Sequence, residues 1–154
     1  MILSPGDAAP VFALEDQHGA VVRLEDFRGR KLLVYFYPKA DTPGCTTQSC
    51  DVRDHLQDLT SFGVDVVGIS PDAPAAQLAF DRKFALGFPL LADTDHAVAE
   101  AWGTWGEKKN YGKTYLGIIR SSFLVDEKGR IEQAWYKVQP AKTVPSAIAA
   151  VEHR

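Results

Sequence analysis

Long hydrophobic runs and long basic runs are both missing from this 154-residue sequence. A membrane-spanning helix needs about 20 consecutive apolar residues, and a nucleic-acid interface needs a concentrated positive face. Here basic residues never stand more than two in a row, and the net charge is −3. We therefore expect neither a membrane nor nucleic acid as a partner. The N-terminus also lacks a charged start followed by an apolar stretch, so we expect no signal peptide and a cytoplasmic protein.

Histidine and cysteine, the usual ligands of transition metals, are scarce. The four histidines are scattered along the chain, and none is placed near Cys45 and Cys50 in a spacing that would complete a zinc site. We expect no metal and no other cofactor. In a cytoplasmic chain, two cysteines are more often catalytic than a structural disulfide.

Hydrophobic patterning indicates one α/β domain over residues 1–154. The length suits a single domain with a sizeable core, and the sequence contains no repeat, low-complexity tract or linker. The apolar run 32–37 and the run 64–69 are typical of strands that are buried on both faces. Segments 12–14 and 21–23 flank a turn signal and predict an N-terminal β-hairpin.

The rest of the chain alternates between helical and extended patterns. We expect a helix from Pro43 to near Gly63, a helix from Pro74 to near Gly87, a brief helix over 96–102, a surface loop over 103–117, a hairpin of 122–125 and 131–138, and a last helix capped by Thr143. This alternation predicts a sheet covered by helices.

Both cysteines lie in the segment 37–50, where a helix is expected to begin. Thr42 is a favoured N-cap residue, and Pro43 suits the first helical position. Cys45 would then lie in the first turn, where unpaired amides and the helix dipole favour an anion. The Thr42 hydroxyl is expected to cap the helix and to donate its proton toward the sulfur. A thiol in that place ionises more readily, and the thiolate is the nucleophile.

The spacing of Cys45 and Cys50 prevents a disulfide while the helix is intact. Five residues of α-helix place their Cα atoms roughly 8–9 Å apart, whereas a disulfide needs about 4.4–6.8 Å. The intervening Thr, Thr, Gln and Ser are mostly poor helix formers. We expect the first turn to unwind at low cost so that the two sulfurs can join.

Pro38, Thr42 and Cys45 together resemble the Pro-x-x-x-Thr-x-x-Cys signature of the peroxiredoxins. The run 36–54, with its second cysteine five positions on, is similar to the bacterioferritin-comigratory, or Q-type, branch. The resemblance continues in order over nearly the whole chain, through segments 69–72, 88–93, 103–109, 111–115 and 120–126.

The resemblance implies an atypical two-cysteine, thioredoxin-dependent peroxidase on a thioredoxin-like fold with a central mixed sheet. Cys45 would be the peroxidatic cysteine, which reduces hydrogen peroxide or organic hydroperoxides and becomes a sulfenic acid. Cys50 would resolve it as an intramolecular disulfide, which thioredoxin or a similar dithiol would reduce. Arg120 matches the family arginine that holds the thiolate.

Groups close to Cys45 in the sequence are expected to assist the reaction. The backbone N–H groups of Gly44 and Cys45 would stabilise charge on the peroxide, and the Pro38 ring would shield the sulfur from water. Lys108 and Lys109 are expected to be solvated.

The chain lacks the long tail of dimeric relatives, so we expect a monomer. Nothing obvious braces the first turn, so we expect resistance to over-oxidation.

Three alternatives stay open on the sequence. A thiol–disulfide oxidoreductase usually separates its cysteines by two residues, whereas four lie between Cys45 and Cys50. A non-enzymatic module would keep the pair as an inert disulfide. A redox sensor that relays oxidation to a partner has the same residues as a peroxidase.

Overall fold

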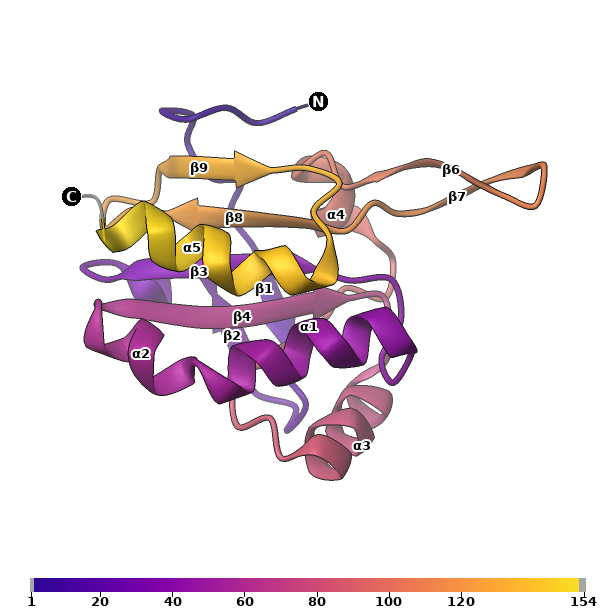
Figure 1. Ribbon diagram of the computed structural model, residues 1–154, viewed down its shortest axis with the longest axis horizontal. Coiled ribbons are helices and arrows are strands. Elements are labelled where there is room, and N and C mark those ends of the chain that lie inside the picture. Colours follow the sequence, from indigo (N-terminus) through magenta and orange to yellow (C-terminus); the bar gives the residue numbers. More distant parts are fainter. Residues whose placement is uncertain (1, 153–154) are drawn as a thin grey trace.

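The computed structural model of the protein describes residues 2–152 and shows an α/β fold around a five-stranded sheet (Figure 1). In pairing order the strands are β5 (Leu90–Ala92), β4 (Val64–Ser70), β3 (Lys31–Phe36), β8 (Ser121–Val125) and β9 (Ile131–Trp135). Strands β3, β4 and β5 are parallel, whereas β8 and β9 are antiparallel to their neighbours. The predicted central mixed sheet is therefore confirmed.

Helices cover both faces of this sheet. On one face lie α1 (Pro43–Asp54), α2 (Leu56–Ser61), α3 (Pro74–Phe84) and α5 (Thr143–Glu152). The other face carries α4 (Ala97–Ala101) and the N-terminal hairpin of β1 (Ala13–Glu15) and β2 (Val21–Arg23), as predicted. In Figure 1, α1, α2 and α5 lie in front of the sheet and β1 and β2 behind it. The fold also contains two short 3-10 helices, η1 (Leu24–Phe27) and η2 (Pro140–Lys142).

Strand β3 divides the hydrophobic core into two clusters. Leu33 and Tyr35 face the cluster under α1 and α5, and Leu32, Val34 and Phe36 face the cluster under the hairpin and α4. All six residues of β3 are buried. Alternating side chains point to opposite faces of a strand, so an unbroken apolar run is what a strand covered on both sides requires.

The segment predicted as a loop over 103–117 is instead a two-stranded ribbon. Strand β6 (Trp105–Asn110) pairs antiparallel with β7 (Lys113–Ile118), and the ribbon projects from one end of the sheet (Figure 1). Tyr111 and Gly112 form its turn with φ of 51° and 76°, the left-handed pair that two-residue hairpins need. Most of β7 is exposed, so the ribbon lacks the apolar alternation that predicts a half-buried strand.

Two other boundaries differ from prediction. The helix expected from Pro43 to near Gly63 is interrupted at His55, whose ring Nδ1 lies 2.9 Å from the Asp51 carbonyl oxygen. Thr143 does not cap the last helix but is its first residue, because η2 leads directly into α5. Among residues 2–152, no helix has the length and apolarity needed to cross a membrane.

Gln17 fastens the N-terminal hairpin to the body of the protein. Its side chain is 6% exposed. Its amide nitrogen donates to the Phe88 carbonyl at 2.9 Å and to Asp81 at 3.0 Å, and its oxygen accepts from the Leu90 amide at 2.9 Å. Sequence reasoning identified this residue only as part of a turn.

Gln17→Ala should destabilise the protein by about 3 kcal/mol, because it leaves a buried carbonyl and a buried amide without partners. The free energy of unfolding from urea titrations measures this cost. His18→Ala removes the exposed neighbour from the same turn and should change the stability by less than about 0.5 kcal/mol. Equal effects of the two substitutions would contradict the fastening role of Gln17.

Candidate functional site

Cys45 is placed by the start of α1, directly beyond the carboxyl end of β3. Thr42 is the N-cap residue in extended conformation, and Pro43 is the first helical residue, as predicted. The first helical amide that bonds back to the chain is that of Thr46, which donates to the Thr42 carbonyl at 2.8 Å. The amides of Gly44 and Cys45 come before it, where an α-helix leaves its N–H groups without carbonyl partners.

Arg120 contacts the sulfur of Cys45, as predicted. Its Nη2 lies 3.4 Å from Cys45 Sγ. The residue lies between β7 and β8, and its carbonyl accepts a hydrogen bond of 2.9 Å from the Val138 amide, which fixes the backbone at that point. A guanidinium and a helix N-terminus therefore both direct N–H donors and positive charge at one sulfur.

Gln48 holds Arg120 in this place. Its Oε1 accepts from Arg120 Nη1 at 2.7 Å, and its Nε2 donates to the Thr143 hydroxyl at 2.7 Å. Gln48 and Thr143 are both fully buried. Sequence reasoning considered Gln48 only as one of the residues between the two cysteines, and the long separation of its partners gave no local signal. The chain of contacts links α5, α1, Arg120 and the sulfur.

Gly44 allows Arg120 to approach the helix. A Cβ atom at this position would lie 3.0 Å from Arg120 Nη2 and 3.5 Å from Pro140 Cγ. Any larger side chain would push the guanidinium away from the sulfur, because Gln48 already holds its other nitrogen. The glycine is thus part of the site through its lack of a side chain.

The sulfur is fully enclosed. Cys45 is 0% exposed, whereas the Pro38 ring was the only shield that the sequence predicted. Arg120 lies against the sulfur, and Pro140 of η2 packs over Gly44. A shallow cavity of about 390 Å³ opens beside this turn, lined by Pro43, Gly44, Thr47, Gln139, Pro140 and Ala141. A peroxide would reach the Cys45 sulfur only after a slight displacement of Arg120 or Pro140.

The Thr42 hydroxyl does not behave as predicted. It makes no capping bond to the helix, and it donates to the Lys39 carbonyl at 2.7 Å instead of pointing its proton at the sulfur. A hydroxyl whose proton is used in this way still presents lone pairs as acceptors. Pro38 is half-buried and lies two residues beyond the end of β3.

Cys45 and Cys50 are both free thiols on the continuous helix α1. Cys50 is half-buried and packs against the cluster that contains Cys45. An intact helix separates their Cα atoms by roughly 8–9 Å, so a disulfide requires α1 to open.

The first turns of α1 are braced, contrary to our expectation of an easily frayed segment. Besides the two hydrogen bonds of Gln48, the Ser49 hydroxyl lies 2.8 Å from the Tyr35 hydroxyl in the core. Burial raises the pKa of Tyr35 well above its ordinary range, so its phenol stays protonated. Gly68 makes room for this ring, because a Cβ there would lie 2.8 Å from the Tyr35 ring and hydroxyl.

Lys108 belongs to the surroundings of the site and is not the fully solvated residue that we predicted. It is half-buried on β6, and a Cβ on Gly117 would lie 3.2 Å from its Cδ atom. Burial lowers its pKa, the charge of Arg120 lowers it further, and the charge of Cys45 acts in the opposite direction. A second cation therefore contributes to the field at the sulfur.

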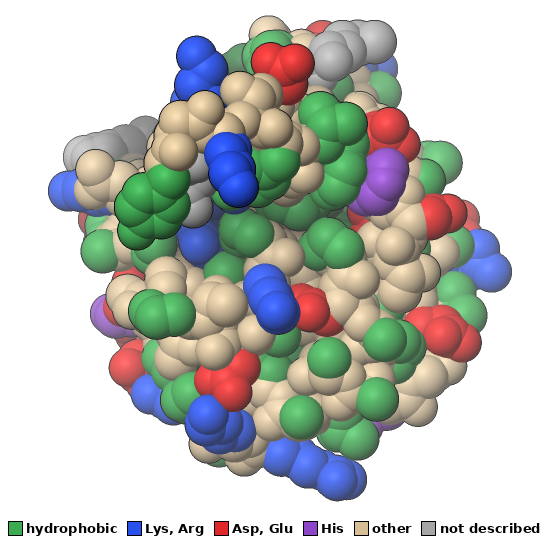
Figure 2. Space-filling view, turned by 90° about the vertical axis from the view of Figure 1, so that its right-hand side faces the viewer, with side chains coloured by type: hydrophobic (Ala, Val, Ile, Leu, Met, Phe, Trp, Pro, Cys, Tyr) green, Lys and Arg blue, Asp and Glu red, His purple; other side chains and the backbone are tan. Residues whose placement is uncertain are grey.

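The end of the molecule that carries the ribbon is shown in Figure 2, where hydrophobic side chains are interspersed with charged ones of both signs. Within residues 2–152, no group of three or more His, Cys, Asp or Glu residues is placed to hold a metal ion.

Comparison with known proteins gives a consistent set of relatives. The family model described as AhpC/TSA family matches residues 5–134. Peroxiredoxin Bcp of Escherichia coli K12 is 54% identical over 133 residues, which cover 86% of this chain and 85% of that protein.

Solved structures agree with this. The bacterioferritin comigratory protein of Xanthomonas campestris, in a study of its alkyl peroxide reduction activity, has a TM-score of 0.87 and 36% identity, with 92% of this chain and 90% of that chain covered. A cysteine-to-serine mutant of Xylella fastidiosa PrxQ has a TM-score of 0.93 and 27% identity, with 99% of this chain and 98% of that chain covered.

Gln48→Ala should slow the oxidation of Cys45 by peroxide about tenfold, because a loosened Arg120 stabilises charge less well than a fixed one. Stopped-flow tryptophan fluorescence against peroxide concentration gives the rate constant. Gln48→Glu keeps an acceptor for Arg120, and the Thr143 hydroxyl can turn to donate to it, so this variant should recover most of the rate.

Gln57→Ala is the matched control, since Gln57 is exposed on α2. It should react like the wild-type protein. A wild-type rate in a correctly folded Gln48→Ala protein would show that Arg120 does not depend on this contact.

Proposed function

The chain belongs to the AhpC/TSA family as a Bcp, or Q-type, peroxiredoxin, a thiol-dependent peroxidase, and we propose that it works by a two-cysteine cycle. In this cycle Cys45 is oxidised by peroxide and Cys50 then forms a disulfide with it. The observation that carries the proposal is the contact of 3.4 Å between Arg120 Nη2 and Cys45 Sγ at the N-terminus of α1.

The first step is a displacement at oxygen. The Cys45 thiolate donates an electron pair to the terminal peroxide oxygen, the S–O bond forms, and the O–O bond breaks. The leaving oxygen takes both electrons of that bond and a proton, and departs as water or an alcohol. The sulfur is oxidised to sulfenic acid and the peroxide is reduced.

Three kinds of groups support this step. The Gly44 and Cys45 amides and the Arg120 guanidinium are donors that stabilise negative charge as it moves onto the peroxide oxygens. The Thr42 hydroxyl, whose proton is held by the Lys39 carbonyl, acts as an acceptor for the peroxide O–H. Pro38 limits the access of water. Catalysis is then mostly placement and electrostatics.

The substrate class follows from the enclosure of the sulfur. A thiol with no exposed surface suits a small hydroperoxide better than a disulfide on another protein, which argues against the thiol–disulfide oxidoreductase alternative. The shallow cavity beside Gly44 is lined mainly by apolar groups, such as those of Pro43, Pro140 and Ala141, and would hold an alkyl substituent. We therefore assign hydrogen peroxide and organic hydroperoxides as substrates, in keeping with the activity named for the Xanthomonas protein.

Resolution requires α1 to open. Once the first turns unwind, the Cys50 thiolate attacks the sulfenic sulfur, the S–S bond forms, and the hydroxyl leaves as water after taking a proton. A dithiol protein such as thioredoxin then reduces the disulfide by exchange and becomes oxidised itself. Opening breaks the hydrogen bonds of Gln48 and Ser49 with Thr143, Arg120 and Tyr35.

Cys45→Ser should abolish peroxide turnover, whereas Cys50→Ser should complete one oxidation and then fail to cycle with thioredoxin. The reason is that only Cys45 lies against Arg120, and only Cys50 is available to displace the sulfenic oxygen. Peroxide oxidation followed by peptide mass mapping identifies the first sulfur to react and any 45–50 disulfide. Sustained thioredoxin-driven turnover in Cys50→Ser would refute its resolving role.

Tyr35→Phe should accelerate disulfide formation after oxidation by about fivefold, because it removes one buried hydrogen bond of about 1 kcal/mol from the closed helix. The ratio of disulfide to sulfinic acid at rising peroxide, read by intact-mass spectrometry, should increase.

Tyr37→Phe is the control for this experiment. Tyr37 is equally buried, but its hydroxyl donates to Gln77 and not to α1. Its substitution should leave the ratio unchanged. If both variants shift the ratio alike, general destabilisation and not the Ser49 contact governs opening.

A further inference from the structure

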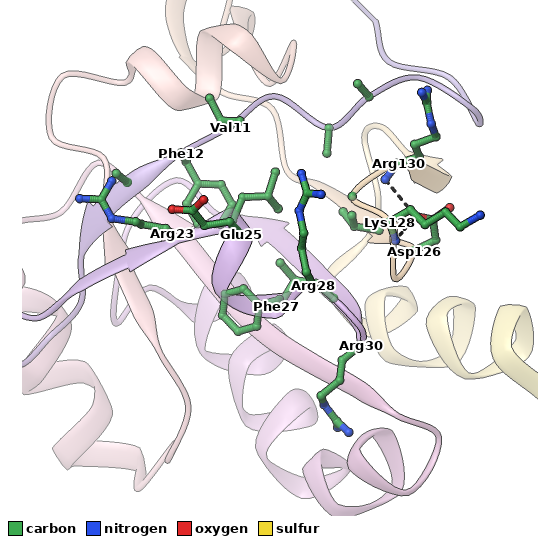
Figure 3. Close-up of a pocket in the computed structure, with 17 residues that line it drawn as sticks. Val11, Phe12, Arg23, Glu25, Phe27, Arg28, Arg30, Asp126, Lys128 and Arg130 are labelled. Atoms are coloured by element: carbon green, nitrogen blue, oxygen red, sulfur yellow. Dashed lines mark hydrogen bonds between the residues drawn. The ribbon is translucent and has the colours of Figure 1, made fainter.

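A cavity of about 530 Å³ lies between the N-terminal segment, η1 and the turn that joins β8 to β9 (Figure 3). This volume is in the range of small-ligand sites. More than half of its 17 lining residues are apolar. Phe12, Leu32 and Val125 are buried at its base, and Leu24 and Phe27 pack against the same cluster.

The rim of this cavity is basic in a chain that is acidic overall. Five cationic residues line it against two carboxylates, whereas the net charge of the whole chain is −3. The cationic residues are Arg23, Arg28, Arg30, Lys128 and Arg130. The carboxylates are those of Glu25 and Asp126.

Some of the charged residues on this rim already have hydrogen-bond or ion-pair partners within the protein. Asp126 Oδ1 accepts the amides of Lys128 and Arg130 at 2.9 Å each, so this carboxylate is occupied within its own turn. Arg30 pairs with Asp65 at 3.1 Å, and Arg130 Nη1 donates to the Gly6 carbonyl at 3.0 Å.

Three of the five cationic residues, Arg23, Arg28 and Lys128, have no hydrogen-bond or ion-pair partner for their charged groups in the part of the chain that the structure describes. Of these three, Arg28 lies between the other two (Figure 3). Figure 3 shows its side chain extending along the cavity beside Phe27, toward the side on which Arg130 lies, whereas Arg30 points away. An unpaired guanidinium beside an apolar wall matches a carboxylate that carries a hydrocarbon portion, because its planar donors bind such an anion bidentately.

The cavity is separate from the peroxidatic site. Arg30 directly precedes β3 and Leu32 is its second residue, whereas Cys45 follows the other end of the strand. A strand of six residues spans roughly 20 Å, so a ligand in the cavity would not touch Cys45, Arg120 or Gln48.

We propose that this cavity, with Arg28 as its anchor, binds a small amphipathic carboxylate. The carboxylate pairs with the Arg28 guanidinium, and the hydrocarbon portion lies on Phe12, Phe27 and Leu24. Both parts of the ligand are needed, since the anchor alone is exposed to solvent and the apolar wall alone gives no orientation. This site is additional to the peroxidase reaction and does not depend on its mechanism.

Decanoate is the probe, titrated into the full-length protein below its micelle concentration by isothermal calorimetry. We expect saturable binding of one decanoate per chain, in the wild-type protein and equally in Cys45→Ser. Inorganic phosphate and decan-1-ol, which each supply only one half of the chemistry, should bind at least about tenfold more weakly. Arg28→Glu should weaken decanoate binding by about tenfold or more, the loss expected for one charged hydrogen-bonded contact.

Arg82→Glu is the matched control, because Arg82 is exposed on α3 and does not line the cavity. It makes the same change in net charge as Arg28→Glu and should leave the affinity for decanoate unchanged. Both variants should keep the peroxidase activity of the wild-type protein. Failure of decanoate to saturate would overturn the proposal. So would equal weakening by Arg82→Glu, equal affinity for phosphate or decan-1-ol, or loss of binding in Cys45→Ser.

Discussion

The contact between the Arg120 guanidinium and the Cys45 sulfur is the interaction on which the site depends. In the described chain, the hydrogen-bond partners of the Arg120 guanidinium are that sulfur and the amide oxygen of Gln48. A neutral partner fixes the guanidinium without neutralising it, so its charge is directed at the sulfur. A carboxylate in place of the Gln48 amide would hold the arginine more tightly but would offset part of its field. The helix N-terminus and Lys108 act with Arg120 on the same atom.

Placing these groups requires several distant parts of the chain. Strand β3 leads to the start of α1, and the segment after β7 contains Arg120. Helix α5 contains Thr143, which binds Gln48. Two glycines make the packing possible: Gly44 lets Arg120 lie against the helix, and Gly68 lets the Tyr35 ring lie under Ser49. The Cys45 thiol is therefore oriented by tertiary packing as much as by its own helix.

The contrast between local helix geometry and tertiary packing explains which parts of the site the sequence predicts and which it does not. Local chemistry placed Cys45 correctly, because Thr42 and Pro43 mark a helix start within a few residues of it. The apolar run at 32–37 likewise identified β3. The Gln48–Thr143 contact joins residues 95 positions apart, and no local pattern encodes such a pair. The ribbon of β6 and β7 escaped prediction because it projects from the body and so lacks an apolar face.

In the proposed two-cysteine cycle, the same hydrogen bonds would support the oxidation of Cys45 and oppose the formation of the disulfide. While α1 is closed, Gln48 holds Arg120 on the sulfur, but the helix keeps Cys50 out of reach. When α1 opens, Cys50 can attack, but Arg120 loses both Gln48 and its place beside Cys45. Tighter bracing therefore favours rapid oxidation and lengthens the life of the sulfenic acid, which exposes it to a second peroxide. The strength of the Gln48 and Ser49 contacts sets the balance between the two steps.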